Sequence, residues 1–174
     1  MRDHLLETLP PTRYRRFLVY VMGPYKAHEM ENEEMFRFLE AVRDGLRAEG
    51  FNAFLATDAE IPLEEMDAGT QSLAFSRASN VVVFVVRRDG KNLGVGIEVG
   101  AVMEDLGERA PERTIFVHEE GVRSAMIAAV GDRWDATVRT FEEMDDLVNV
   151  VRLFARDVMR KETEGELPFP PEEP

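Results

Sequence analysis

Residues 80–107, NVVVFVVRRDGKNLGVGIEVGAVMEDLG, decide the fold that the sequence predicts. The run Val81–Val86 is apolar throughout, too short for a helix and too apolar for a surface strand, which indicates a central strand of a parallel sheet. A polar turn follows, and Gly94 and Gly96 then precede Glu98, where we expect a helix to begin. Glycines at such a point let a ligand approach the backbone, and the free N–H groups of a helix start favour negative charge. The segment therefore predicts a ligand site with an ionised Glu98 at its mouth.

Segments of alternating type flank this strand on both sides. We expect further strands over residues 17–22, 51–56, 114–117 and 136–139, and helices over 32–49, 64–77, 98–106, 121–130 and, after a capping box formed by Thr140 and Glu143, as far as 160. Strand and helix thus alternate five times with short connections. This pattern predicts an α/β fold, a flavodoxin-like doubly wound parallel five-stranded sheet, and analogy with such sheets gives the strand order 2-1-3-4-5.

Length and composition bound the protein class. A chain of 174 residues suits one domain, which we place at residues 13–160, with a short lead-in at 1–12 and a disordered acidic, proline-rich tail at 161–174. The chain has no cysteine, which excludes disulfides, thiol catalysis and thiolate metal sites. No apolar run approaches the roughly 20 residues that span a membrane, so we expect a cytoplasmic protein without a membrane partner.

The charge balance is strongly acidic, with a formal net charge of −13. A carboxylate-rich surface is compatible with a salt-adapted, halophilic cytoplasm, and it argues against nucleic acid as a partner because phosphate backbones require clustered cations. Two local clusters could nevertheless contact anions, and the first of them could equally be solvated surface beside a strand; they are Arg13, Arg15 and Arg16, and Arg87, Arg88 and Lys91.

Three motifs in order along the chain carry a family resemblance. They are Asn92-Leu-Gly-Val-Gly-Ile-Glu-Val-Gly100, Ser124-Ala-Met-Ile127 and Met22-Gly23-Pro24. The first resembles the glycine-flanked glutamate segment of the nucleoside deoxyribosyltransferase superfamily, most closely that of its 2'-deoxynucleoside 5'-phosphate N-hydrolase branch. The second is similar to another segment of that branch, and the third resembles the superfamily's Gly-Pro turn. The resemblance spans residues 17–127 and implies a small-molecule nucleotide as the partner, with no cofactor and no metal.

The resemblance implies a catalytic role for Glu98. In the family, the glutamate at this position attacks the anomeric carbon of a 2-deoxyribosyl group and the base departs, after which water or a second base accepts the sugar. A second acid should protonate the departing base. The family aspartate aligns with Ser72 here, so Asp67, about one helical turn upstream, is our candidate for that acid. Asn92 replaces the family's aspartate or serine and can hold a sugar hydroxyl, although an amide transfers no proton.

The resemblance also implies how the substrate is held. Gly23, Gly94 and Gly96 would let it approach the backbone, Lys26 would supply a cation, and Tyr25 would pack against sugar or base. Ser124 would donate to a phosphate at a helix start. In the resembled branch that serine reaches the neighbouring subunit's site, which implies a homodimer.

Each of these residues also has a simpler structural interpretation. Glu98 can be an acid favoured by the helix dipole, Tyr25 and Lys26 turn residues, Ser124 a helix cap and Asp67 a solvated acid. Three hypotheses follow for function. The first is an N-glycosidase or transferase acting on a deoxynucleoside 5'-monophosphate or related nucleotide, the second a non-catalytic nucleotide-binding module, and the third an NAD-cleaving effector similar to Toll/interleukin-receptor-like domains.

Overall fold

Five parallel strands form one sheet in the order β2-β1-β3-β4-β5, which confirms the predicted fold class and strand order. The computed structural model describes residues 1–23, 33–61, 67–88, 92–122 and 131–171. The strands are β1 (Tyr14–Met22), β2 (Phe51–Phe54), β3 (Val81–Val86), β4 (Thr114–Glu119) and β5 (Thr137–Phe141). The helices are α1 (Arg2–Thr8), α2 (Glu33–Ala48), α3 (Ala68–Ala78), α4 (Asn92–Leu106), the 3-10 turn η2 (Gly107–Arg109), α5 (Ala110–Arg113) and α7 (Met144–Thr163).

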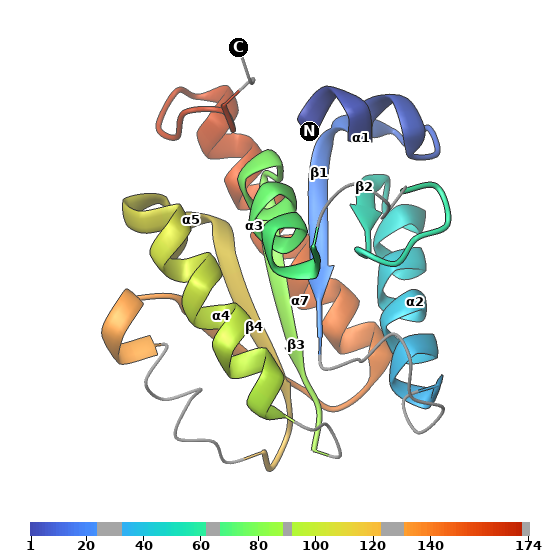
Figure 1. The fold of residues 1–174 in the computed structure, drawn as a ribbon, viewed down its shortest axis with the longest axis vertical. Coiled ribbons are helices and arrows are strands. Elements are labelled where there is room, and N and C mark those ends of the chain that lie inside the picture. Colours follow the sequence, from blue (N-terminus) through green and yellow to red (C-terminus); the bar gives the residue numbers. More distant parts are fainter. Residues whose placement is uncertain (24–32, 62–66, 89–91, 123–130, 172–174) are drawn as a thin grey trace.

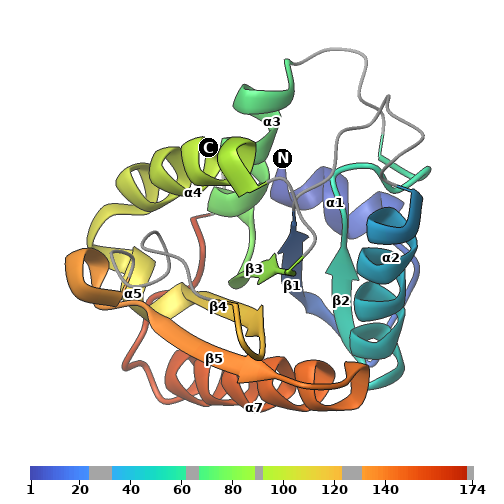
Figure 2. The ribbon, with the colours of Figure 1, turned by 90° about the horizontal axis from the view of Figure 1, so that it is seen from below.

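Helices cover both faces of the sheet, as Figures 1 and 2 show. One core layer joins the sheet to α1, α3, α4 and α5, and the other joins it to α2 and α7. Alternate residues of β1 serve the two layers, because successive strand side chains point to opposite faces. Both faces of β3 are consequently buried, which explains why Val81–Val86 is apolar without alternation.

Helices α2 and α7 pack closely because α2 has a glycine, Gly45, where the two helices meet. A Cβ added at Gly45 of α2 would stand 2.7 Å from Val148 Cγ2 of α7. The predicted apolar stripe of α2 is confirmed, since its buried residues are Met35, Leu39, Val42 and Leu46. The predicted capping box is wrong, because Thr140 lies in β5 and Glu143 caps α7 without a side-chain hydrogen bond.

Segments at both ends of the chain pack against the domain. The lead-in forms α1, whose Leu5 and Leu6 are buried in the core. At the other end, α7 continues to Thr163, beyond the predicted boundary at 160, and Leu167 packs against the core layer of α2 and α7. Pro170 is buried as well. Hydrophobic burial at both ends therefore attaches these segments to the domain.

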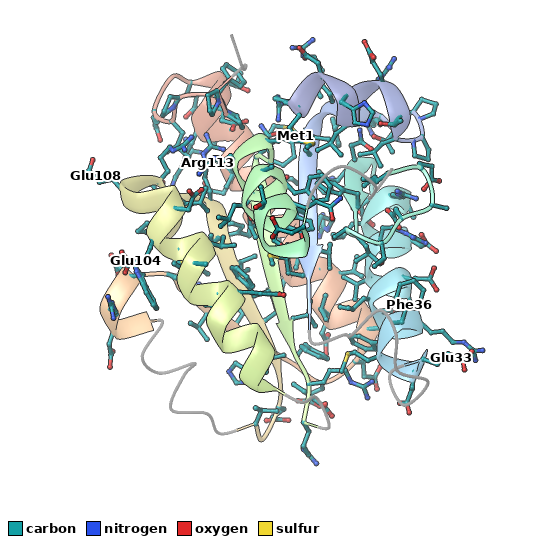
Figure 3. All side chains as sticks on the ribbon, viewed as in Figure 1. Met1, Glu33, Phe36, Glu104, Glu108 and Arg113 are labelled. Atoms are coloured by element: carbon teal, nitrogen blue, oxygen red, sulfur yellow. The ribbon has the colours of Figure 1, made fainter. Side chains whose placement is uncertain are left out.

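A buried polar network ties together the end of the molecule where both termini lie (Figure 1). Arg113 of α5 donates to Glu162 of α7 over 2.7 Å and to the carbonyl of Asn80 over 2.9 Å, and Figure 3 labels Arg113 at this end. The Asn80 side chain donates to the same Glu162 carboxylate and accepts from Leu18 N and from Arg2 of α1. Each buried charge thereby faces an opposite charge or a hydrogen-bond partner.

Within the part of the chain that the structure describes, no helix is long and apolar enough to cross a membrane.

Candidate functional site

The carboxyl ends of the strands meet at the edge of the sheet that Figure 2 views face-on. Neighbouring strands β1 and β3 run parallel, with Met22 paired to Phe84, so Gly23 follows β1 directly beside the last residues of β3. Helix α4 begins at the same edge, six residues after β3 ends at Val86. In open α/β sheets this edge, at the point where the strand order reverses, is where ligands bind.

The glycine-rich segment is helical, which corrects our prediction of a helix start at Glu98. Helix α4 begins at Asn92, so Gly94 and Gly96 lie inside it and Glu98 lies in its second turn. The first-turn dipole therefore acts on residues 92–95 rather than on Glu98. Glycine within a helix costs roughly 1 kcal/mol relative to alanine, so two glycines in the opening turns indicate a need for backbone close to another group.

Glu98 is exposed, yet the protein around it removes part of its hydration. Burial raises the pKa of the Glu98 carboxyl above its ordinary value, because the charged form loses more solvation than the neutral form. Among the described residues, the structure gives Glu98 no hydrogen-bond or ion-pair partner.

Asp67 caps helix α3. Its carboxylate accepts from Thr70 N at 3.0 Å and from Thr70 Oγ1 at 2.6 Å. The side-chain and backbone hydrogen bonds from Thr70 lower the pKa of Asp67, so this exposed carboxylate is ionised at neutral pH. An ionised cap accepts protons poorly and has none to donate, so the capping contacts do not prepare Asp67 to act as an acid.

Ser72, where the sequence resemblance predicts an aspartate, lies further along α3 and faces β1. The Tyr20 hydroxyl donates to Ser72 Oγ over 3.5 Å, a long contact, and the Tyr20 ring stacks on Phe54 at 5.1 Å between centroids. Phe75 meets the same Tyr20 ring edge-on. At position 72, the side chain that contacts the core layer therefore has a hydroxyl, whereas the aspartate predicted by the resemblance would have a carboxyl.

Gly23 also has a packing role that the sequence did not reveal. A Cβ added at Gly23 would stand 2.7 Å from Leu39 Cδ2, and Leu39 is fully buried in α2. The glycine therefore lets α2 lie against the end of β1. Close approach of the helix is a structural reason for glycine here, alongside approach of a ligand.

A cation cluster follows β3 at the same edge. The Arg87 guanidinium lies 4.6 Å from the centre of the Phe38 ring and makes ion pairs with Glu34 at 3.5 Å and Glu119 at 3.7 Å. Arg88 donates from its backbone N–H to Glu119 and from its side chain to the Glu120 carbonyl. The sequence indicated these arginines as anion contacts; the structure adds the acids and the ring that hold them.

Carboxylates gather where β4 and β5 end. The like charge of Glu120 raises the pKa of Glu142, with a hydrogen bond between the two acids contributing as well. His118, at the end of β4, contacts the Glu119 carbonyl through Nδ1 at 3.1 Å. This side of the edge disfavours phosphate, so an anion is better placed toward β1, β3 and the start of α4.

Several predicted site residues cannot be placed in this arrangement. Tyr25, Lys26 and Ser124 lie outside the described residues, as do the side chains of Asn92 and its neighbours up to residue 97. Over the described ranges, no group of three or more His, Cys, Asp and Glu residues could hold a metal ion. Of the predicted site residues, the structure describes Gly23 after β1, Glu98 in the second turn of α4 and Asp67 at the start of α3.

The fold is shared with several solved structures. The chain matches the Clostridium botulinum CMP N-glycosidase BcmB with a TM-score of 0.52 and 10% identity, covering 78% of this chain and 98% of that one. It matches the solution structure of BlsM with a TM-score of 0.56 and 15% identity, covering 93% and 99%. A flavodiiron core from Synechocystis matches with a TM-score of 0.51 and 9% identity, covering 89% of this chain and 38% of that chain. At these identities the likeness shows the fold alone.

Comparison with curated proteins finds no match. The family model described as "Domain of unknown function (DUF7509)" matches residues 2–33 and 28–170, and the chain therefore belongs to that family.

Proposed function

We propose that this protein processes nucleotides, cleaving or transferring at the N-glycosidic bond of a deoxynucleoside 5'-monophosphate or a related nucleotide. The observation that carries the proposal is the placement of Glu98. It lies in a glycine-rich helix that begins at the carboxyl edge, and it has a partly desolvated carboxyl without a partner among the described residues. The edge is the part of this fold in which ligands bind.

Two separate comparisons support this chemistry. The motif around Glu98 resembles that of the deoxynucleoside 5'-phosphate N-hydrolases, and the fold is similar to that of a protein named as a CMP N-glycosidase. A cytidine monophosphate and a deoxynucleoside monophosphate share a base, a pentose and a 5'-phosphate. Both enzyme names refer to cleavage of the N-glycosidic bond.

The proposed reaction has two steps. The Glu98 carboxylate attacks C1' of the sugar, a C–O bond forms and the C1'–N bond breaks, and the base leaves with the bonding electrons and takes up a proton. Water then attacks C1', the bond to Glu98 breaks, and the carboxylate is regenerated as the water gives up its proton. The carboxylate also stabilises the oxocarbenium-like transition state of each step.

A non-catalytic nucleotide-binding module is the second candidate, and specific observations favour it. Ser72 stands where the family aspartate aligns, and Asp67 is engaged as a helix cap with a lowered pKa. Neither arrangement supplies a proton to the departing base. This module would bind the nucleotide at the same edge and leave it intact.

Base release from a panel of nucleotides distinguishes the proposed enzyme from the non-catalytic binding module. Deoxynucleoside monophosphates and cytidine monophosphate are incubated with the protein, and free base is followed by chromatography. We expect release that falls about a thousandfold or more in Glu98→Gln, because this substitution removes the nucleophile and keeps the shape. Glu104→Gln is the matched control, since Glu104 lies on the same helix and makes an exposed ion pair with Arg133.

Other results have equally definite meanings. Release that persists in Glu98→Gln contradicts the assigned role of Glu98. Thermal stabilisation by a nucleotide without any base release identifies the binding module. No stabilisation and no release by any nucleotide in the panel rejects both candidates.

The proposal includes a homodimer in which Ser124 of one subunit contributes to the phosphate site of the other, as in the resembled branch. Light scattering after size exclusion gives the mass of the particle, which we expect to be twice 19.8 kDa. A monomer at assay concentration rejects the shared site. Base release by a mixture of Glu98→Gln and Ser124→Ala proteins, each inactive alone, would demonstrate it by complementation.

A further inference from the structure

A pocket of about 830 Å³ lies at the amino edge of the sheet, opposite the candidate active site. It is formed by α1, the start of β1, the end of α7 and the C-terminal segment at 169–170. These elements lie together at the upper end of Figures 1 and 3, whereas α4 and α2 begin at the lower end. A volume of several hundred Å³ suits a drug-sized or nucleotide-sized molecule.

The pocket lining is positively charged, whereas the protein as a whole is acidic. Of the 21 Lys and Arg residues of this acidic chain, four line the pocket, namely Arg2, Arg13, Arg15 and Arg16, against one of its 34 acids, Glu162. The one acid is compensated, because Glu162 is buried and receives hydrogen bonds from Arg113 and Asn80. The field inside the pocket is therefore positive, which favours an anion.

The arginines are positioned by the fold. Arg2 is buried and donates to the Arg16 carbonyl over 2.6 Å, which fixes the backbone from which the Arg16 side chain extends. Arg15 donates to the Leu6 carbonyl through Nε and Nη2, over 3.2 and 2.8 Å. The Arg13 guanidinium lies 5.3 Å from the centre of the Tyr14 ring. These contacts fix the guanidinium groups of Arg2 and Arg15, whose positive charges favour phosphate or carboxylate at the pocket.

The wall of the pocket also has apolar side chains. Phe17 and Met159 line the pocket from β1 and α7, and Phe169 lines it from the C-terminal segment. Phe169 is 66% exposed, so a ligand can reach its ring. Aromatic and apolar side chains beside cations suit a ligand that has a flat apolar part as well as a charge.

We propose that this amino-edge pocket binds a small organic phosphate that carries a flat aromatic group, at a site separate from that of Glu98. The arginines bind the phosphate, and Tyr14, Phe17 and Phe169 contact the ring. A long polyanion is disfavoured because the net charge of −13 repels it outside the pocket.

Amide shifts in NMR spectra of the full chain test the site directly. The probes are inorganic phosphate, phenyl phosphate, ATP and a single-stranded oligonucleotide. We expect phenyl phosphate and ATP to shift the amides of Tyr14, Phe17 and Phe169 and to bind more tightly than inorganic phosphate. Binding weakens as salt is added, because the phosphate contacts are screened.

Three variants assign the contacts. Arg13→Ala weakens ATP binding about tenfold or more in calorimetry, as expected for loss of a charged hydrogen bond. Phe169→Ala weakens ATP and phenyl phosphate but leaves inorganic phosphate unchanged. Arg133→Ala is the matched control, because its guanidinium also lies on a neighbouring ring, 4.9 Å from the centre of Trp134, and it does not line the pocket.

The proposal is overturned by any of three results. The first is the absence of shifts at Tyr14 and Phe17 with every probe at millimolar concentration. The second is ATP binding that maps to Gly23 and Val99 instead and is insensitive to Arg13→Ala and Phe169→Ala. The third is binding of the oligonucleotide alone. The exposure of Arg13 and Phe169 keeps the variants folded, which their far-UV spectra and melting temperatures verify.

Discussion

Glu98 is a carboxyl that the protein leaves without a charge partner among the described residues while it removes part of its water. Burial raises its pKa, so the ionised form is less favoured in the folded chain than in the unfolded one. A nucleophile needs the ionised form, whereas an acid needs the protonated form. The pH dependence of Glu98 consequently distinguishes these two roles, and it also affects stability.

Glu98→Gln should stabilise the protein increasingly as pH rises. Because the folded pKa of Glu98 is raised, the residue contributes fully to the free energy of unfolding below the ordinary glutamate pKa. That contribution is lost as pH rises through the folded pKa, because the partly desolvated carboxyl must then ionise. Glutamine does not ionise, so the variant does not lose stability in this way. Melting temperatures measured from pH 4 to pH 8 give the difference between variant and wild type. A difference that stays constant or shrinks with pH would contradict partial desolvation of Glu98. Glu104→Gln on the same helix is the control.

Base release should rise with pH through the raised Glu98 pKa if Glu98 is the nucleophile, because only the carboxylate attacks the sugar. Single-turnover rates at saturating nucleotide isolate the chemical step from binding. A rate that falls over the same interval would assign Glu98 the role of acid instead, since the protonated fraction falls as pH rises.

Gly23→Ala should destabilise the fold by about 1–3 kcal/mol through overpacking. The new methyl group would stand 2.7 Å from Leu39 Cδ2, which is fully buried and cannot move into solvent. Leu39→Ala alone should cost about 2–5 kcal/mol. The double variant should cost less than the sum, because the smaller side chain leaves room for the methyl group. Urea titrations provide the four free energies of unfolding, and strict additivity would show that the two positions are not in contact.

At the scale of the element, the start of a helix decides what its side chains can do. Helix α3 begins after Asp67, so that carboxylate serves the free N–H of Thr70. Helix α4 begins at Asn92, so its glycines are helical and Glu98 lies beyond the first turn. Sequence patterns predict the presence of a helix more reliably than they predict its first residue. The reason is that the same apolar face results whichever turn begins the helix.

Asp67→Ala should lower the melting temperature because it removes the acceptor that caps α3, and Asp67→Asn should retain most of the stability. The lowered folded pKa adds a pH signature. The contribution of Asp67 is present above the ordinary aspartate pKa and is lost as pH falls through the folded pKa, so Asp67→Asn should flatten that part of the profile. If Asp67→Asn retains stability but abolishes base release, the residue is a catalytic acid as well as a cap.

At the scale of the whole molecule, the two edges of the sheet have different characters. The carboxyl edge has the glycines and Glu98, while the amino edge has a network that joins both ends of the chain through Arg2, Asn80, Arg113 and Glu162. Arg113 and Glu162 are each 2% exposed in their side chains, so water offsets little of their charge. Such a pair is costly to break from one side.

Arg113→Met should destabilise the protein by about 3–5 kcal/mol, because it leaves the Glu162 carboxylate buried without its cation. The double variant with Glu162→Leu should recover part of the loss, since it removes the second charge too. Arg160→Met, which breaks only exposed ion pairs on α7, should change stability little. Chemical denaturation measures all three. A single variant as stable as Arg160→Met would show that the pair is hydrated in solution.

The sequence by itself determined the fold class. The apolar run Val81–Val86, buried on both faces, and the alternation around it were sufficient for the parallel sheet, because strands buried on both faces carry no polar residues. The strand order was predicted by analogy with other doubly wound sheets. The role of Glu98 stays a prediction from the glycine spacing and the family resemblance.

Only the tertiary structure decided the rest. It showed that α1 and Leu167 pack into the core, that Asp67 is a cap, and that Leu39 requires glycine at position 23. It also brought Arg13 and Phe169 from opposite ends of the chain into one pocket. Apart from the Asp67 cap, which is local, these contacts join residues far apart in sequence, and no local pattern of polarity or spacing encodes which distant side chain will lie opposite.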